Sequence, residues 1–137
     1  MKILFLDIDG VLCTLRSHIA AQKYGGLMVD WDKTSCNIIK YICNKWNFQI
    51  VISSTWRHAD EPLLNQRLAE FELEQYCLKG EYRYTPSSFR TRGFEIAQWL
   101  QLFERELNVE DYIIIDDDAD WHNLKDHWIL IEDPFNG

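Results

Sequence analysis

Hydrophobic and polar positions follow two alternating patterns along the chain. Short runs that are apolar apart from Lys2 and Gln49, as is typical of strands buried on both faces, cover residues 2–6, 48–52, 112–115 and 128–131. Between them, apolar residues recur at every third or fourth position, which predicts helices over residues 32–46, 62–76 and 93–107. Residues 13–30 follow neither pattern and are expected to form a loop. Residues 78–88 are expected to be irregular, with short extended pieces around Tyr82 and Tyr84.

Two details of the predicted helices can be tested directly. Asp32 or Thr34 is a suitable N-cap for the first helix, because a short polar side chain can accept hydrogen bonds from the free N–H groups there. Trp46 and Trp99 fall on the apolar stripes of their helices. We therefore expect both tryptophans in the hydrophobic core.

The order of these elements predicts the fold class. Buried strands that alternate with amphipathic helices are typical of a parallel sheet covered on both faces. We predict an α/β fold, a three-layer Rossmann-like sandwich with a mostly parallel central sheet. The chain has 137 residues, of which 47% are apolar, enough for one compact core. A single domain over residues 1–137 is the expectation.

Polar side chains follow three of the four predicted strands directly. They are Asp7 and Asp9, Ser53 and Ser54, and Asp116 and Asp117. In a parallel sheet these residues share the carboxyl edge, where ligands bind in such folds. Carboxylates crowded there need a cation, and an all-oxygen site suits Mg²⁺. An acid after a strand often only caps a helix or forms a turn; its repetition at three strand ends favours a site.

These strand ends resemble the motifs of one enzyme superfamily. Asp7-Ile8-Asp9-Gly10-Val11 resembles the first motif, D-x-D-G-[TV], of the haloacid dehalogenase-like (HAD) superfamily. Ile50-Val51-Ile52-Ser53 is similar to the second motif, and Ile113-Ile114-Ile115-Asp116-Asp117 to the fourth in its D-D form. The third motif is one basic residue, for which Arg92 is the first choice and Lys79 the second.

Two further segments resemble one subgroup of this superfamily. Thr55-Trp56-Arg57 and the ending at residues 132–137 are similar to a subgroup of small HAD domains, some of them attached to RNA-repair proteins. Trp56 could wall the pocket or pack against a helix. Arg57 could grip a second phosphate or a carboxylate, or pair with a nearby acid. The sequence leaves both choices open.

The resemblance implies a Mg²⁺-dependent phosphatase, a phosphomonoester hydrolase that acts through an aspartyl-phosphate. Asp7 would be the nucleophile and Asp9 the acid/base. Ser53, Ser54 and Arg92 would bind the phosphoryl group.

The resemblance also implies a set of metal ligands. Mg²⁺ would be held by Asp7, by the backbone carbonyl of Asp9 and chiefly by Asp117. Asp116 would lie beside the ion in a supporting role.

The spacing of the motifs bears on the substrate. Neither interval between them holds a separately folded cap domain, since independent domains seldom fall below ~50 residues. An open site with small lids from residues 13–30 and 77–90 is expected. Such a site suits a phosphate on a larger molecule, such as a nucleotide or the 3′- or 5′-phosphate of a nucleic acid. The net charge of −8 argues against extended nucleic-acid binding and against an anionic membrane surface.

A different class of function fits part of the pattern. A non-catalytic or phospho-accepting regulatory module, with a HAD-like or receiver-like fold, would also gather acids at strand ends. In receivers, however, the acceptor aspartate ends the third strand and no D-x-D-G follows the first. A structural protein leaves the aligned acids unexplained. The oligomeric state stays open.

The cysteines bear on the cellular compartment. No two of the four form a C-x-x-C pair, so neither a zinc ribbon nor a redox motif is indicated. We expect reduced, mostly buried thiols and hence a cytoplasmic protein. The N-terminal apolar stretch is too short for a signal peptide or a membrane span.

Overall fold

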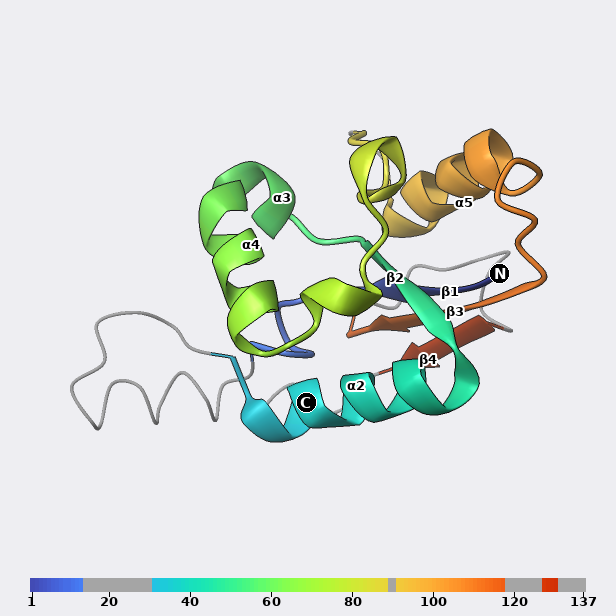
Figure 1. Cartoon of the computed structure of the whole chain (residues 1–137). Coiled ribbons are helices and arrows are strands. Elements are labelled where there is room, and N and C mark those ends of the chain that lie inside the picture. Colours follow the sequence, from blue (N-terminus) through green and yellow to red (C-terminus); the bar gives the residue numbers. More distant parts are fainter. Residues whose placement is uncertain (14–30, 89–90, 118–126, 131–137) are drawn as a thin grey trace, which may run out of the picture.

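A parallel four-stranded sheet forms the centre of the molecule (Figure 1). The computed structural model describes residues 1–13, 31–88, 91–117 and 127–130. The strands are β1 (Lys2–Leu6), β2 (Phe48–Ile52), β3 (Asp111–Asp116) and β4 (Trp128–Leu130). They lie in the order β2-β1-β3-β4, and every pairing is parallel. The predicted α/β fold is confirmed, and the described residues contain no separate cap domain.

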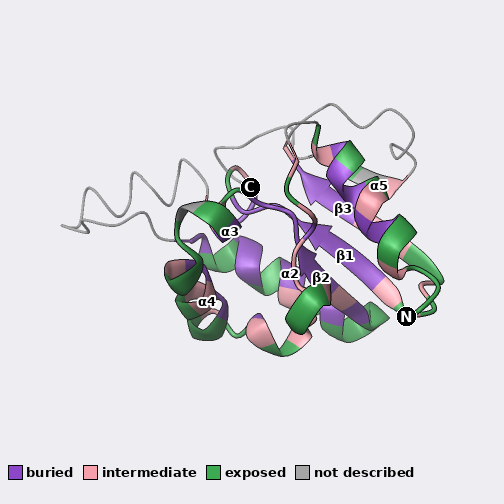
Figure 2. Cartoon of the chain, turned by 90° about the horizontal axis from the view of Figure 1, so that it is seen from above, coloured by how far each residue is buried: buried purple, intermediate pink, exposed green. Residues whose placement is uncertain are grey.

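Helices cover both faces of this sheet. They are α2 (Lys33–Trp46), α3 (Trp56–Ala59), α4 (Glu61–Glu70) and α5 (Arg92–Phe103), with short 3₁₀ helices η1 (Glu74–Tyr76) and η2 (Gly80–Tyr82). In Figure 1, α2 lies on one side of the sheet and α5 on the other. Figure 2 shows strands buried over most of their length and helices with exposed outer sides. The three-layer arrangement therefore stands as predicted.

Alternation along the strands divides the core into two halves. Leu4 and Leu6 of β1 face a cluster that includes residues of α2 and α4. Ile3 and Phe5 face the other way, against Trp99 of α5. The rings of Phe5 and Trp99 meet edge to face, with centroids 5.3 Å apart. Both faces of β1 are thus covered, which explains its unbroken apolar run.

The first long helix begins and ends on local signals. Asp32 is its N-cap, and Asp32 Oδ1 accepts hydrogen bonds from the N–H groups of Thr34 (2.9 Å) and Ser35 (3.2 Å). Asn47, with φ 59°, ends the helix in the left-handed conformation. Of the two predicted caps, Asp32 is therefore the one in use.

The prediction of one helix over residues 62–76 is wrong. α4 ends at Glu70, and Glu72 adopts a left-handed φ of 61°. The N–H of Leu73 then bonds back to the carbonyl of Leu68 at 2.8 Å, and both leucines are fully buried. This is a Schellman end, in which the apolar contact accompanies the backbone bond. The position that usually holds glycine holds Glu72 here, so the sequence carried no stop signal.

The two tryptophans expected in the core have different outcomes. Trp99 is fully buried, as predicted. Trp46 is 45% exposed, so that prediction is wrong. It is the last residue of α2, where Asn47 turns the chain into β2, and its ring packs against Tyr41 on the outer side of the helix.

The segment from Cys77 to Thr85, expected to be part of a lid, lies along β2. The N–H of Leu78 bonds to Ile50 O at 3.0 Å, and the N–H of Thr85 bonds to Ile52 O at 3.1 Å. Tyr84 is extended beside Ile52, as predicted, whereas Tyr82 belongs to η2. The segment therefore covers the outer edge of β2. The remainder of the expected first lid, residues 14–30, lies outside the described residues, as does the ending at 132–137.

Several smaller expectations can also be compared. α5 ends at Phe103, one turn before the predicted Leu107. All four cysteines are free thiols, and three of them, Cys36, Cys43 and Cys77, are buried. Burial raises the pKa of the Cys43 and Cys77 thiols to about 12. Within the described residues, no helix has the length and apolar character needed to cross a membrane.

Candidate active site

The strand register brings the predicted site residues to one edge. Leu6 pairs with Ile52 on one side and with Ile115 on the other, so the next residue of each strand meets at the carboxyl edge. The N–H of Asp7 bonds to Ile115 O at 3.1 Å, and the N–H of Ser53 bonds to Leu6 O at 2.9 Å. Asp7, Ser53 and the last residue of β3, Asp116, therefore lie side by side.

Three carboxylates form an acidic cluster at this edge, made of Asp7, Asp116 and Asp117. One oxygen from each lies within 4.8 Å of the others. Asp7 is 3% exposed and Asp116 1%, so both carboxylates are taken from water. An all-oxygen group of this kind suits a hard divalent cation such as Mg²⁺.

Gly10 leaves space for the carboxylate of Asp117, because it has no side chain. Its φ of +80° is left-handed, and a Cβ there would lie 2.1 Å from Asp117 Oδ2. Any side chain would displace that carboxylate. The turn after β1 therefore requires glycine for both its backbone conformation and its contact with Asp117.

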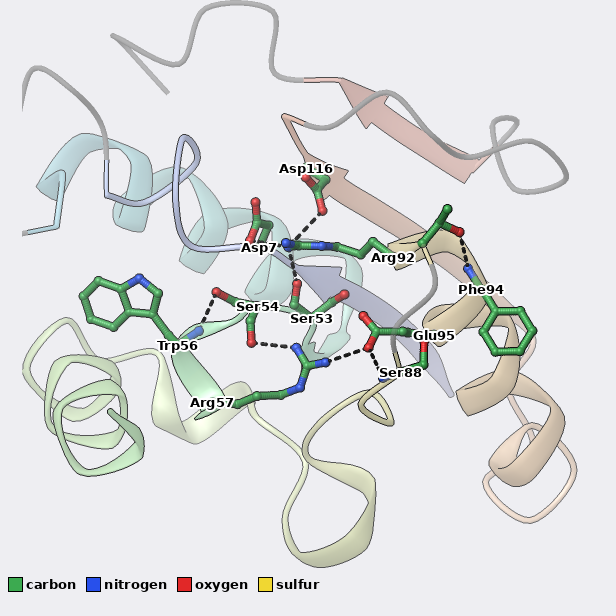
Figure 3. Close-up of polar contacts among 11 residues, drawn as sticks. Asp7, Ser53, Ser54, Trp56, Arg57, Ser88, Arg92, Phe94, Glu95 and Asp116 are labelled. Atoms are coloured by element: carbon green, nitrogen blue, oxygen red, sulfur yellow. Dashed lines mark hydrogen bonds and ion pairs between the residues drawn. The ribbon is translucent and has the colours of Figure 1, made fainter. Parts of the chain in front are cut away.

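Arg92, the first residue of α5, reaches into the acidic cluster (Figure 3). Its Nη1 donates to Asp7 Oδ1 at 2.5 Å and to the Ser53 carbonyl oxygen at 2.6 Å, and it lies 3.3 Å from Asp116 Oδ2. Lys79 is exposed and forms no ion pair with these acids within the described part of the chain. Of the two basic candidates, the structure brings Arg92 to the site.

Acids outnumber basic groups in this cluster. The described residues place three carboxylates and one guanidinium there. Burial and the neighbouring Asp116 raise the pKa of Asp7 to about 8, although Arg92 opposes them. A divalent cation bound between these oxygens would favour the ionised form of the carboxylates. The residues present therefore fit a metal ion.

The two serines after β2 differ in their hydrogen bonding. Ser53 Oγ is buried and has no hydrogen-bond partner within the described residues. Ser54 Oγ accepts a hydrogen bond from the N–H of Trp56 at 3.3 Å. A buried hydroxyl without a partner is costly unless a ligand satisfies it. Ser53 is thus the serine whose side chain is ready to donate to a bound group.

Comparison with known proteins identifies the family. The family described as the HAD domain in Swiss Army Knife RNA repair proteins matches residues 3–134 of the chain. The chain belongs to this family. The resemblance to small HAD domains of RNA-repair proteins is thereby confirmed over nearly the whole length. No curated protein and no solved structure matches the chain.

Asp9 lies apart from the acidic cluster of this HAD domain. It is exposed, and its Oδ1 accepts a hydrogen bond from the indole Nε1 of Trp56 at 2.9 Å. The backbone beyond it is tightly turned, since the N–H groups of Leu12 and Cys13 both bond to Ile8 O. The first motif thus presents one buried carboxylate, that of Asp7, and one exposed carboxylate, that of Asp9.

Arg57 of the HAD domain pairs with a nearby acid, which is the second of the two roles considered for it. Its Nη2 pairs with Glu95 Oε2 at 3.1 Å, and its Nη1 donates to the carbonyl oxygen of Ser54 at 2.6 Å. Glu95 also accepts from the N–H of Ser88 at 2.8 Å. Figure 3 shows the pair on the far side of Ser53 and Ser54 from the acidic cluster. Arg57 ties the loop after β2 to α5.

Glu95 was not singled out in the sequence. Its side chain is 10% exposed, although it belongs to the first turn of α5, where an acid normally faces solvent and favours the helix dipole. It lies three residues after Arg92 and four before the buried Trp99, so all three share one face of the helix. A charged residue on the otherwise apolar face of this helix is the sequence signal by which Glu95 could have been predicted to be buried.

Trp56 contacts both a group of aromatic rings and the first motif. It packs edge to face against Trp31, with ring centroids 5.7 Å apart, and Trp31 in turn stacks on Phe71 at 5.9 Å. At the same time its indole N–H reaches Asp9. Trp56 is therefore part of the wall beside the site as well as part of the packing.

Proposed function

We propose that this HAD domain is a Mg²⁺-dependent phosphomonoester hydrolase that acts through an aspartyl-phosphate on Asp7. The observation that carries the proposal is the buried acidic cluster at the carboxyl edge, joined to Arg92. Buried carboxylates gathered at the edge where α/β folds bind ligands, with the pKa of Asp7 raised to about 8, are typical of a functional site. Membership in a HAD family supports the same reaction class.

The metal would be held by the acidic cluster. Asp117 and Asp7 would be the main ligands, with the backbone carbonyl of Asp9 and with Asp116 in support. When bound, the ion stabilises the negative charge that spreads over the phosphoryl oxygens during transfer. Arg92 remains beside Asp7 and Asp116, and its positive charge favours the ionised form of the nucleophile.

The first step would form the bond from Asp7 to phosphorus. A carboxylate oxygen of Asp7 attacks the phosphorus, the bond from phosphorus to the ester oxygen breaks, and Asp9 gives its proton to the departing alcohol. The Ser53 hydroxyl donates to a phosphoryl oxygen, which satisfies an otherwise unpaired buried group.

The second step would return the enzyme to its starting state. Asp9, now ionised, takes a proton from a water molecule as that water attacks the phosphorus. The bond from phosphorus to Asp7 breaks, and inorganic phosphate leaves. The exposed position of Asp9 suits this role, because both the alcohol and the water must reach it.

The substrate we propose is a terminal phosphate of RNA. The family takes its description from RNA repair proteins, and the phosphomonoesters of an RNA chain are its terminal 3′- and 5′-phosphates. The described residues contain no cap domain, so a long chain can approach the edge. The net charge of −8 fits recognition of an end rather than of an extended backbone.

The test is a phosphatase screen with Mg²⁺. p-Nitrophenyl phosphate, nucleotides, sugar phosphates, phosphopeptides and oligonucleotides with 3′- or 5′-phosphates are compared. Asp7→Asn should abolish hydrolysis and Asp9→Asn should reduce it strongly. Asp111→Asn, the same change at the opposite end of β3, is the matched control and should retain activity.

Two results would contradict the proposal. A wild-type protein inert on the whole panel would remove the enzymatic reading. A stable phosphorylated adduct after treatment with acetyl phosphate, without turnover, would instead support a phospho-accepting module.

A further inference from the structure

Trp56 is held at both ends beside the catalytic edge. It begins α3, two residues after Ser54, and its backbone N–H donates to Ser54 Oγ at 3.3 Å. Its indole Nε1 donates to Asp9 Oδ1 at 2.9 Å. The side chain therefore has one defined position, between the loop after β2 and the exposed carboxylate of the first motif.

The contact with Asp9 places Trp56 relative to the reaction. In the proposed function Asp9 protonates the departing oxygen, so its carboxylate lies on the leaving-group side of the phosphorus. A side chain bonded to that carboxylate lies on the same side. Trp56 therefore borders the space that the alcohol portion of the substrate occupies.

The indole is also supported from behind. Trp31 is 3% exposed and packs against Trp56 at 5.7 Å, and Phe71 stacks on Trp31 at 5.9 Å with an angle of 19° between the rings. Trp56 itself is partly exposed. An aromatic ring that is fixed by neighbouring rings and still partly exposed can stack on a planar group at low entropic cost.

Charge gives this protein little general attraction for RNA, so stacking on Trp56 would contribute much of the binding. The chain carries a net charge of −8. The two arginines drawn in Figure 3 are both engaged with acids, Arg92 with Asp7 and Asp116, and Arg57 with Glu95. The acidic net charge gives little general attraction for an RNA backbone, and stacking of a base is a source of affinity that does not depend on charge.

We propose that Trp56 is the stacking surface for the terminal nucleobase of the RNA, next to the phosphate that is removed. The inference rests on the proposed phosphatase function and adds a specificity residue to it. The indole N–H has a second task, since it holds the Asp9 carboxylate in place. The ring and the N–H thus make separate contributions, one to binding of the base and one to positioning of Asp9.

Two substitutions separate these contributions. Trp56→Phe keeps an aromatic face and loses the N–H, whereas Trp56→Ala loses both. Each is assayed on oligoribonucleotides with a 3′- or a 5′-phosphate, made with and without a base on the terminal nucleotide. Glycerol phosphate, which has no base, is the third substrate.

The expected result is a split between KM and kcat. On the preferred end, wild type and Trp56→Phe should show a KM at least about five-fold lower when the terminal base is present, the lower end of the range of base–aromatic stacking. Trp56→Ala should lose this difference and leave the KM for glycerol phosphate unchanged. Both variants should lower kcat alike on all substrates, because both release Asp9.

Binding without turnover gives an independent readout. In the Asp7→Asn background, fluorescence anisotropy of labelled oligonucleotides should show the same dependence on base and ring. If Trp56→Ala still prefers the substrate with a base, or if wild type has no such preference, the stacking proposal is wrong. If Asp7→Asn still hydrolyses phosphate esters, the proposed function itself is wrong.

Discussion

Asp7 should make the metal-free protein less stable as the pH rises, and the substitution Asp7→Asn should remove this dependence. Burial and the neighbour Asp116 raise the pKa of Asp7 from 3.8 to about 8, against the opposing effect of Arg92. The folded protein thus holds a proton that the unfolded chain has lost. The stabilising contribution is complete below about pH 4 and disappears as the pH rises through about 8.

The magnitude follows from the linkage between protons and folding. Where the unfolded chain is ionised and the folded one protonated, each pH unit lowers the free energy of unfolding by about 1.4 kcal/mol. From about pH 5 to about pH 7, Asp7 should therefore account for a loss of about 2.5 kcal/mol. Asp7→Asn has no proton to lose at this position and should show a flatter dependence.

Urea titrations in EDTA at several pH values measure this difference. The free energy of unfolding of wild type is compared with that of Asp7→Asn, and Asp111→Asn is the control that should keep the wild-type slope. Saturating Mg²⁺ should stabilise wild type more at about pH 7 than at about pH 5, because the ion binds the ionised carboxylates. Equal slopes for wild type and Asp7→Asn in EDTA would refute the reasoning.

Two further substitutions test the surroundings of the acidic cluster. Gly10→Ala should weaken Mg²⁺ binding in calorimetry at least about ten-fold, because its Cβ would displace Asp117. Gly80→Ala, also at positive φ but with nothing within 4 Å, should leave that affinity intact; equal effects would contradict the argument. Glu95→Gln should lower the free energy of unfolding by about 3 kcal/mol, since it leaves Arg57 buried without a counter-charge. A loss below about 0.5 kcal/mol would show the pair to be worth no more than a surface one.

The sheet could be predicted because its strands are buried on both faces. Such strands have largely apolar sequences, and β1 and β2 begin and end where the runs do. The strand ends then place Asp7, Ser53 and Asp116 together, because a parallel register carries one carboxyl end beside the next. The regular register of parallel strands is enough to bring these site residues together. Their position can therefore be predicted without knowing which side chains are in contact.

Helix ends depended on contacts that the spacing of apolar residues does not contain. The pattern through residue 76 continued past Glu70, but burial of Leu68 and Leu73 against each other stabilised a turn in which Glu72 is left-handed. A glycine at that position would have shown the break. Tertiary packing therefore overrode a local preference that pointed the other way.

The face of α5 shows why the site was only partly visible in the sequence. From Ile96 onward this face is apolar, because it packs against the sheet. Its first turn instead carries Arg92, which bonds to Asp7 and Ser53 after β1 and β2, and Glu95, which pairs with Arg57 of α3. That turn lies over the carboxyl edge, where backbone carbonyl and carboxylate groups replace apolar side chains. Charged residues in the first turn of an otherwise apolar helix face are therefore expected wherever a helix extends over such an edge. Which residue each charge pairs with can be seen only in the structure.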